Sequence, residues 1–191
     1  MLACLRLVGW CCVDSGYYKM PEKTAEDFVM HEDGKVYFHT GDIGVLHEDG
    51  VLQIVDRKKD LIKLEGGEYV SLGMVESKLK SVAGIGQCAV FARSDKKFCV
   101  CIVSQPEKGW ASLGFPDGAP TKEELLAAID PTLRKLGVAR HEIPKDVRVD
   151  DEIWTPESGL VTASLKVARN PLREFYNETL LKDMDYQFPT K

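Results

Sequence analysis

Several features that would assign a function class are missing from this 191-residue chain. No two of its six cysteines are spaced as Cys-x-x-Cys, and no paired histidines lie near them, so the sequence indicates no zinc or redox site. The net charge of −5 lacks the basic excess of nucleic-acid-binding proteins, which need a basic face to neutralise phosphates. We therefore expect no metal site and no nucleic-acid partner.

Long hydrophobic runs are also missing. The apolar stretch at residues 2–13 has Arg6 as its only charge and is shorter than the roughly 20 residues that cross a bilayer. It also lacks the basic start and small-residue cleavage pattern of a signal peptide. We therefore expect an intracellular protein that is not secreted, placed in the cytoplasm or at the cytosolic face of an organelle membrane. The sequence encodes no clear signal for membrane association.

What is present is an ordinary globular composition. With 44% hydrophobic and 29% charged residues, the chain can bury a core for one domain plus an appendage, or for one and a half domains. Cys99 and Cys101 alternate with apolar residues, so both should face one side of a strand. Buried, reduced thiols in a reducing compartment are the natural interpretation.

The segment up to residue 60 favours turn-rich β structure. Asp49-Gly50 between two apolar runs predicts a hairpin, because glycine accepts the positive φ of a tight turn. Asp42 and Arg57 flank this hairpin, which can therefore bring a carboxylate close to a guanidinium. The expected elements are a short helix at 21–28 and strands near 36–39, 43–46 and 51–55.

From residue 59 onward the pattern is mixed α and β. Thr121 and Glu124 form a capping box, and Pro131 is expected to end that helix near Ile129 or to restart a second one. The fold class is therefore α+β, with a β-rich segment before a small mixed domain whose short sheet packs with helices. The other expected elements are a helix capped by Ser71, strands at 87–92, 98–103 and 146–149, and a closing helix capped by Asn170-Pro171 with Leu172, Phe175, Tyr176 and Leu180 on its buried face.

Four motifs carry a resemblance to a known family. The runs Phe38–Gly44 and Ile54–Asp60 resemble the adenylate-forming, AMP-binding superfamily. The runs Gly66–Leu72 and Trp154–Thr162 narrow this resemblance to eukaryotic-type long-chain acyl-CoA synthetases. The similarity extends from about Gly16 to about Tyr176 and corresponds to the carboxy-terminal region of such an enzyme.

The resemblance implies three parts. Residues 1–15 are an unmatched N-terminal segment, residues 16–58 are the β-rich end of the large AMP-binding domain, and residues 59–191 are the mobile C-terminal domain, with the boundary at Lys58 to Asp60. The family's phosphate loop, its magnesium-holding glutamate, its adenine-stacking aromatic and its fatty-acyl tunnel are expected in the large domain, outside this chain.

The resemblance also implies roles for residues on the nucleotide side. Asp42 matches the carboxylate that accepts hydrogen bonds from both ribose hydroxyls, and Arg57 matches a cation that contacts ribose and phosphate oxygens. A turn-capping aspartate and a surface ion pair are the plain alternatives. Lys166 matches the catalytic lysine that bridges the α-phosphate and the acyl carboxylate and so stabilises the charge between them. Leu165 departs from the family, which usually has an aromatic residue there.

Two further sites are implied for the second half-reaction. Lys59 matches the hinge about which the C-terminal domain pivots between adenylation and thioester formation. Lys63, Gly66, Gly67 and Glu68 match a loop on the coenzyme A side, where paired glycines permit close approach of the narrow pantetheine arm. Taken alone, two glycines more often make a turn.

The resemblance therefore implies part of a long-chain fatty acid–CoA ligase, which converts fatty acid, ATP and CoA to acyl-CoA, AMP and diphosphate through an acyl-adenylate. The expected cofactors are ATP/AMP, CoA and Mg²⁺, with the Mg²⁺ ligands outside this chain. Because the large domain is missing, we expect the chain to be inactive on its own. Two alternatives stay open: a binding or regulatory module that docks on a separate large domain, and a ligase for another class of carboxylic acid.

Overall fold

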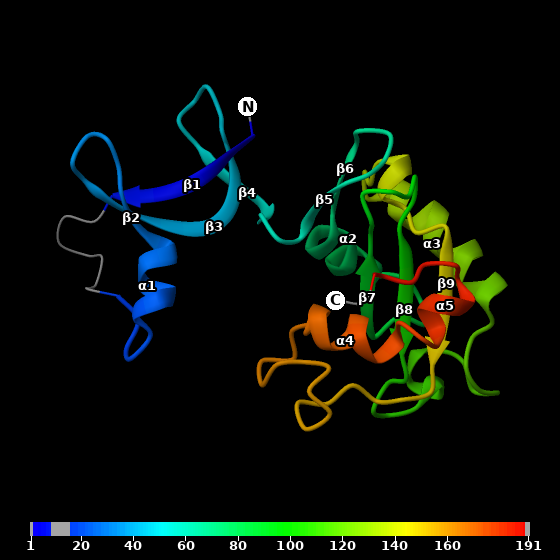
Figure 1. The fold of residues 1–191 in the computed structure, drawn as a ribbon. Helices are drawn as coiled ribbons and strands as arrows, with labels where there is room; N and C mark the ends of the chain where they lie inside the picture. Colours follow the sequence, from blue (N-terminus) through cyan, green and yellow to red (C-terminus); the bar gives the residue numbers. More distant parts are fainter. Residues whose placement is uncertain (1, 9–15, 190–191) are drawn as a thin grey trace. The chain divides into compact units, whose positions relative to one another are not determined.

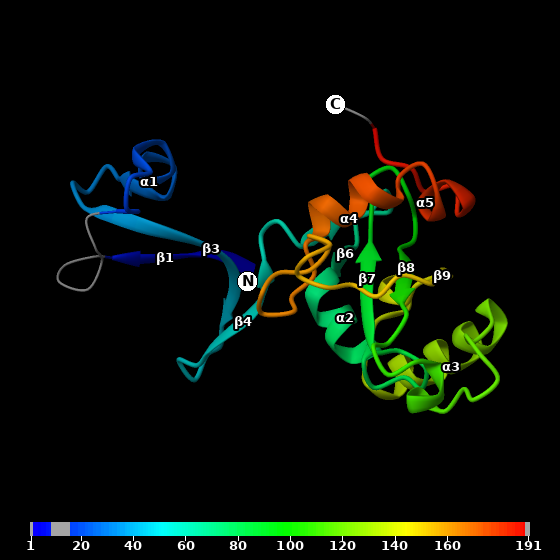
Figure 2. The same cartoon turned by 90° about the horizontal axis from the view of Figure 1, so that it is seen from below.

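The computed structural model describes residues 2–8 and 16–189, with side chains from residue 16 onward. The chain divides into two compact units, Met1–Leu61 (unit 1) and Ile62–Lys191 (unit 2), drawn in Figure 1 and, turned by 90°, in Figure 2. The sequence predicted a boundary at Lys58 to Asp60, and the two units divide directly after these residues, between Leu61 and Ile62. The predicted α+β class is confirmed, because each unit combines short sheets with helices.

Unit 1 is built around one long strand. The predicted hairpin is confirmed, since the His47 N–H donates to the carbonyl of Val51 at 2.9 Å and Gly50 closes the turn with φ of +84°. The prediction of separate strands at 36–39 and 43–46 was wrong. The two form one continuous strand, Val36–Leu46, whose pairing with the following strand contains a β-bulge between Ile43 and Gly44. The elements are α1 (Pro21–Asp27), β2 (Phe28–Met30), β3 (Val36–Leu46) and β4 (Leu52–Arg57), and β3 pairs antiparallel with β1 (Leu2–Val8), β2 and β4.

The apolar N-terminal stretch received no strand prediction. Its described part, Leu2–Val8, is strand β1, which pairs along β3 from Leu2 opposite Val45 to Val8 opposite Tyr37. The rest of the stretch lies outside the described residues. Within the described ranges, no helix has the length and apolar character needed to cross a bilayer.

Unit 2 is a three-layer structure with a sheet in the middle. Its strands are β7 (Gln87–Phe91), β8 (Val100–Ser104) and β9 (Asp146–Asp150), with β7 antiparallel and β9 parallel to β8. All five residues of β8 are buried, because helices cover both faces of the sheet. In Figure 2, α2 (Leu72–Leu79) and α3 (Lys122–Lys135) lie on one face, and α4 (Arg169–Tyr176) and α5 (Leu180–Asp183) lie on the other. The remaining elements are β5 (Leu61–Lys63), β6 (Tyr69–Ser71), η1 (Trp110–Leu113) and η2 (Arg140–Glu142).

Helix α3 confirms one prediction and corrects another. Its capping box is present, with the Glu124 N–H donating to Thr121 Oγ1 at 3.2 Å and the Thr121 N–H donating to Glu124 Oε2 at 2.8 Å. The prediction that Pro131 breaks the helix was wrong, because α3 continues to Lys135. Its buried side chains, Leu125, Ile129 and Leu133, recur every four residues on both sides of the proline, so packing outweighs the hydrogen bond that the proline cannot donate.

The closing helix also differs from its prediction. Helix α4 begins at Arg169, so Asn170 lies inside its first turn and does not cap it. Leu172 and Tyr176 are buried as predicted, but Phe175 is 57% exposed. The predicted apolar spacing continued to Leu180, whereas the chain turns after Tyr176 and starts a separate helix, α5, whose buried residue is Leu181.

Three thiols lie in the core beneath α2 and α3. Cys88, Cys99 and Cys101 are free and fully buried in one hydrophobic cluster, which confirms the predicted shared face of Cys99 and Cys101. Burial raises the pKa of the Cys99 thiol from its ordinary value of 9.0 to about 12, because a thiolate would lose its hydration there. The pKa of the Cys101 thiol is also raised, first by its hydrogen bond with Cys88 and then by burial.

Unit 2 should therefore lose stability as the pH rises above about 9. The folded chain holds the Cys99 proton more tightly than the unfolded chain does, so this contribution is complete below the unfolded pKa and is lost as the pH approaches about 12. The free energy of unfolding, measured with urea between pH 8 and 11, should fall as the pH rises. This fall should be less steep in Cys99→Ala than in the unmodified chain, by up to about 1.4 kcal/mol per pH unit. Val103 is buried in the same cluster, and Val103→Ala should lower the free energy of unfolding by the same amount at every pH. A pH-independent loss in Cys99→Ala as well would contradict the prediction.

Candidate functional site

Asp42 and Arg57 face each other across the β3–β4 pair. They are register partners, and the distance from Arg57 Nε to Asp42 Oδ1 is 3.7 Å. The side chain of Arg57 is 74% exposed and that of Asp42 is 30% exposed, so the pair adds little stability and both groups remain accessible to a ligand. Next to Asp42, the Thr40 side chain makes a local hydrogen bond, in which its Oγ1 accepts from the Asp42 N–H at 3.1 Å.

A cavity of about 890 Å³ within unit 1 contains both residues on its wall. Its other lining groups include Lys23, Asp27 and Lys59, so both cations and carboxylates line it. Lys23 donates to Asp27 and, with Tyr17, lowers the pKa of that carboxyl. The volume is within the range of small-molecule and cofactor sites, which makes this cavity the candidate nucleotide site of unit 1.

Lys59 lies in the turn that follows β4. The Asp60 N–H donates to the carbonyl of Arg57 at 2.9 Å, and the Lys58 N–H donates to that of Gly41 at 2.7 Å. Lys59 itself is exposed and lies two residues before Leu61, the last residue of unit 1. A solvated turn at this place can absorb a change of backbone dihedrals, as the predicted hinge requires.

The loop predicted on the coenzyme A side connects β5 to β6. The Gly67 N–H donates to the carbonyl of Leu64 at 3.0 Å, and φ of Gly67 is +93°, so the two glycines form a tight turn. A Cβ atom at Gly67 would have no atom within 4 Å, whereas one at Gly66 would lie 2.4 Å from Glu68 Oε2. Lys63 extends beside this turn, with its Nζ 6.0 Å from the centre of the Tyr69 ring. Gly67 therefore presents open backbone to solvent.

Lys166 lies at the end of a narrow loop before α4. The Thr162 N–H donates to the Lys166 carbonyl at 2.8 Å, and the Lys166 N–H donates to Thr162 Oγ1 at 3.1 Å. The side chain of Lys166 is exposed, so its ammonium points away from the core. Leu165, the departure from the family pattern, is 53% exposed with φ of +58°, a backbone conformation that costs leucine energy.

Buried polar groups hold both ends of the segment that carries Lys166. At its start, the Trp154 Nε1–H donates to Asp150 Oδ2 at 3.0 Å and lies 2.8 Å from the Tyr176 hydroxyl, which itself donates to Asp150. At its end, Arg169 makes a two-pronged ion pair with Glu76, at 2.7 and 3.1 Å. The loop is thus fixed at both ends while its tip stays in solvent.

The sequence interpretation did not include the Glu76–Arg169 pair. Glu76 was predictable as a buried charge in need of a partner, because it follows Leu72 by four residues on the apolar stripe of α2. Its partner was not predictable, because Arg169 lies 93 residues later.

The Lys166 loop and the β5–β6 turn lie at opposite ends of the β7–β8 hairpin. The Gln87 side chain, at the start of β7, donates to the Leu165 carbonyl at 3.5 Å. At the other end, the carbonyl of Lys96 in the β7–β8 turn accepts from the Glu65 N–H at 3.1 Å. Figure 1 shows the same separation within unit 2, with the β5–β6 turn and the loop before α4 at opposite ends. The predicted site residues of unit 2 therefore form two groups.

Breaking the buried ion pair should strongly destabilise unit 2. Glu76→Gln keeps the shape of the side chain but leaves the Arg169 guanidinium without its counter-charge, and we expect a loss of about 3 kcal/mol in urea unfolding. The control is Asp130→Asn, which removes the exposed pair with Arg134 in α3 and should cost less than about 1 kcal/mol. Equal losses for the two variants would contradict this interpretation.

Comparisons with known proteins identify the family. No protein-family model matches the chain. Long chain acyl-CoA synthetase 8 of Arabidopsis thaliana is 38% identical over 189 residues, which are 92% of this chain and 26% of that protein. Fatty acyl-CoA synthetase B of Dictyostelium discoideum is 32% identical over 181 residues, 89% of this chain and 26% of that protein.

A solved structure shows the same fold. The adenylation domain of a carboxylic acid reductase from Segniliparus rugosus, in complex with AMP and a co-purified carboxylic acid, matches with a TM-score of 0.75 and 29% identity, over 90% of this chain and 26% of that chain. The chain thus spans about a quarter of the length of the relatives it matches. Over that region, it belongs to the long-chain acyl-CoA synthetase family of adenylate-forming proteins.

Proposed function

We propose that this chain supplies the lysine-carrying part of a long-chain fatty acid–CoA ligase, which forms acyl-CoA, AMP and diphosphate from fatty acid, ATP and CoA. One observation carries the proposal. In a chain whose relatives are long-chain acyl-CoA synthetases, Lys166 is exposed in a loop that is anchored at both ends. A cation held this way can approach an anionic reaction centre without losing its position relative to the sheet.

The nucleotide would be held by unit 1. The Asp42 carboxylate would accept hydrogen bonds from the two ribose hydroxyls, and Arg57 would donate to ribose and phosphate oxygens. Their accessible placement at the cavity and the AMP-bound structural relative support this assignment. Lys166 would then contact the α-phosphate and the attacking carboxylate together, which reduces their repulsion as charge develops between them.

Mg²⁺ would supply additional neutralisation of the phosphates. Within the described residues, no three histidine, cysteine, aspartate or glutamate side chains gather into a group that could hold a metal ion. By resemblance to the family, we assign its ligands to the part of the ligase outside this chain.

The two half-reactions would use opposite ends of unit 2. Lys166 serves adenylation, while Lys63 and the Gly66–Glu68 turn, at the other end of the β7–β8 hairpin, serve acyl transfer to CoA. One reaction centre can face only one end at a time, so unit 2 must turn between the steps, about the exposed turn at Lys59. The open backbone at Gly67 suits the approach of the narrow pantetheine arm.

Partners and location follow from the same assignment. Leu46, Leu52 and Ile54 lie on one face of the β3–β4 hairpin and are 49 to 67% exposed, which supports a large AMP-binding domain as the neighbour that covers them. This face would serve equally if the large domain came from a separate polypeptide, as in the regulatory-module alternative. We place the ligase inside the cell, in the cytoplasm or at the cytosolic face of an organelle membrane.

A graft tests the proposal. The chain would replace the matched quarter of Arabidopsis long chain acyl-CoA synthetase 8, and we expect the hybrid to form acyl-CoA from a long-chain fatty acid, whereas the chain alone forms none. Lys166→Ala should lower ATP–pyrophosphate exchange, which reports adenylation, by about 10²- to 10³-fold. Lys135→Ala, an exposed lysine at the end of α3, should leave the exchange unchanged.

The same hybrid separates the half-reactions. Gly67→Val fills the open side of the β5–β6 turn and strains a backbone with φ of +93°, so it should slow acyl transfer to CoA while pyrophosphate exchange continues. Exchange that persists in Lys166→Ala, or a hybrid that accepts only short or aromatic acids, would overturn the proposed function.

A further inference from the structure

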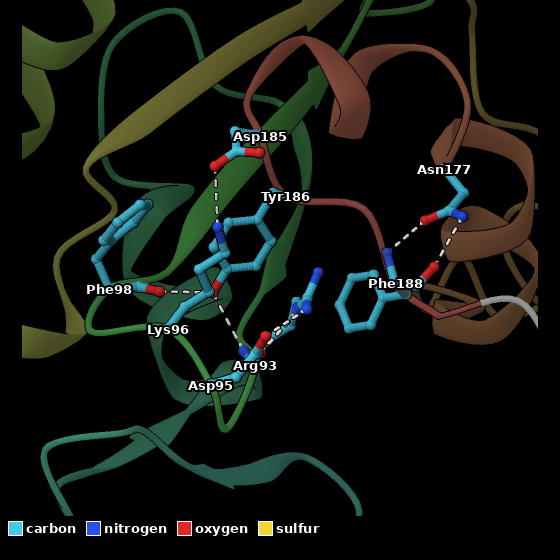
Figure 3. A network of polar contacts seen from close by, with 8 residues as sticks. All are labelled: Arg93, Asp95, Lys96, Phe98, Asn177, Asp185, Tyr186 and Phe188. Atoms are coloured by element: carbon cyan, nitrogen blue, oxygen red, sulfur yellow. Dashed lines mark hydrogen bonds and ion pairs between the residues drawn. The ribbon is translucent and has the colours of Figure 1, made fainter.

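The C-terminal segment of the chain folds back onto the β7–β8 turn. Tyr186 is fully buried although it follows the last helix, and its ring packs against Phe98 with the ring centres 5.7 Å apart. Figure 3 shows the polar contacts of this segment: Asp185 and Tyr186 contact the turn, and Phe188 contacts Asn177. Buried groups therefore hold this segment against the rest of unit 2.

One hydroxyl group closes the β7–β8 turn at both of its ends. The Tyr186 hydroxyl donates to the carbonyl of Phe98 at 2.5 Å and accepts from the Arg93 N–H at 3.1 Å. Burial raises the pKa of Tyr186 above its ordinary value, so the group remains a neutral donor. The Lys96 ammonium, in the middle of the turn, also pairs with Asp185 at 3.1 Å.

Phe188 fixes the segment beyond the tyrosine. The Asn177 side chain accepts from the Phe188 N–H at 2.6 Å and donates to the Phe188 carbonyl at 3.0 Å, as Figure 3 shows. The guanidinium groups of Arg93 and Arg173 lie 5.6 and 5.1 Å from the centre of the Phe188 ring. These contacts add cation–π attraction and hold the tyrosine in register with the turn.

The β7–β8 turn also supports the turn between β5 and β6. The Lys96 carbonyl accepts from the N–H of Glu65 at 3.1 Å, and Glu65 directly precedes Gly66 and Gly67. The hydrogen bonds thus run without a gap from the C-terminal segment to the glycine turn. Every group in this path lies in unit 2.

We propose that residues 185–188 form a brace that positions the Gly66–Gly67 turn for acyl transfer to CoA, with Tyr186 as its positioning residue. The consequence for transfer rests on the proposed function, whereas the mechanical coupling does not. A displacement of about 1 Å at a reacting group can cost two orders of magnitude in rate, so a distant brace can affect the transfer step. Tyr176 has the corresponding place at the other end of unit 2, beside Trp154 and Asp150 at the start of the Lys166 segment.

Hydrogen exchange of the 191-residue chain tests the coupling, with Tyr186→Phe and Tyr176→Phe as matched variants that each lose one buried hydroxyl. Tyr186→Phe should speed the exchange of the amides of residues 64–67 and 93–98 by roughly three- to tenfold and leave residues 154–168 unchanged. Tyr176→Phe should do the reverse. If Tyr186→Phe fails to fold by circular dichroism, Phe188→Ala is the second variant and should act on the same amides. Unchanged exchange at residues 64–67 would overturn the brace.

The grafted ligase tests the consequence for catalysis. Tyr186→Phe should raise the KM for CoA or slow acyl transfer by roughly tenfold while pyrophosphate exchange stays as in the unmodified hybrid. Faster amide exchange with unchanged acyl transfer would reduce Tyr186 to a purely structural role and refute the positioning role. If the unmodified hybrid forms no acyl-CoA, the proposed function fails. The hydrogen-exchange measurement on the 191-residue chain still decides whether the brace exists.

Discussion

The ion pair between Glu76 and Arg169 is the constraint on which the arrangement of unit 2 depends. The Glu76 carboxylate accepts from Arg169 and from the Val90 N–H, and Arg169 also donates to the Val90 carbonyl, so three elements meet at one charge pair. Removing most of the water from these two charges costs hydration energy, which their hydrogen bonds offset. Because Arg169 follows Lys166 by three residues, the same contacts that join α2, β7 and α4 also fix where the Lys166 loop begins its return to the core.

The sheet of unit 2 connects two loops that are each held by buried groups. Tyr176 and Trp154 hold the loop segment at one end, and Tyr186 holds the β7–β8 turn at the other. Both tyrosines are buried with hydrogen-bonded hydroxyls, which keeps each anchor specific in geometry as well as apolar in packing. The exposed loops that carry Lys166 and Gly67 are therefore held by anchored segments, so in the proposed function a turn of the whole unit would exchange one loop for the other without changing the fold of either.

Local patterns determined what the sequence could predict. The Asp49-Gly50 hairpin and the Thr121–Glu124 capping box were predictable, because each involves residues close together in sequence. The continuity of α3 through Pro131 was not, because packing on the sheet decides it. The motifs identified Lys166 and Asp42 by resemblance, yet the groups that hold the Lys166 loop, and the link from Tyr186 to Phe98 across 88 residues, depend on contacts that no local pattern encodes.

The distribution of buried side chains differs between the two units. Unit 2 buries a cluster on each face of its sheet, whereas among residues 16–61 no hydrophobic side chain is buried. Residues 16–61 therefore gain little hydrophobic free energy to offset the entropy of ordering their strands. In the proposed ligase, a large AMP-binding domain would cover the face that carries Leu46, Leu52 and Ile54 and would complete the cavity beside Asp42.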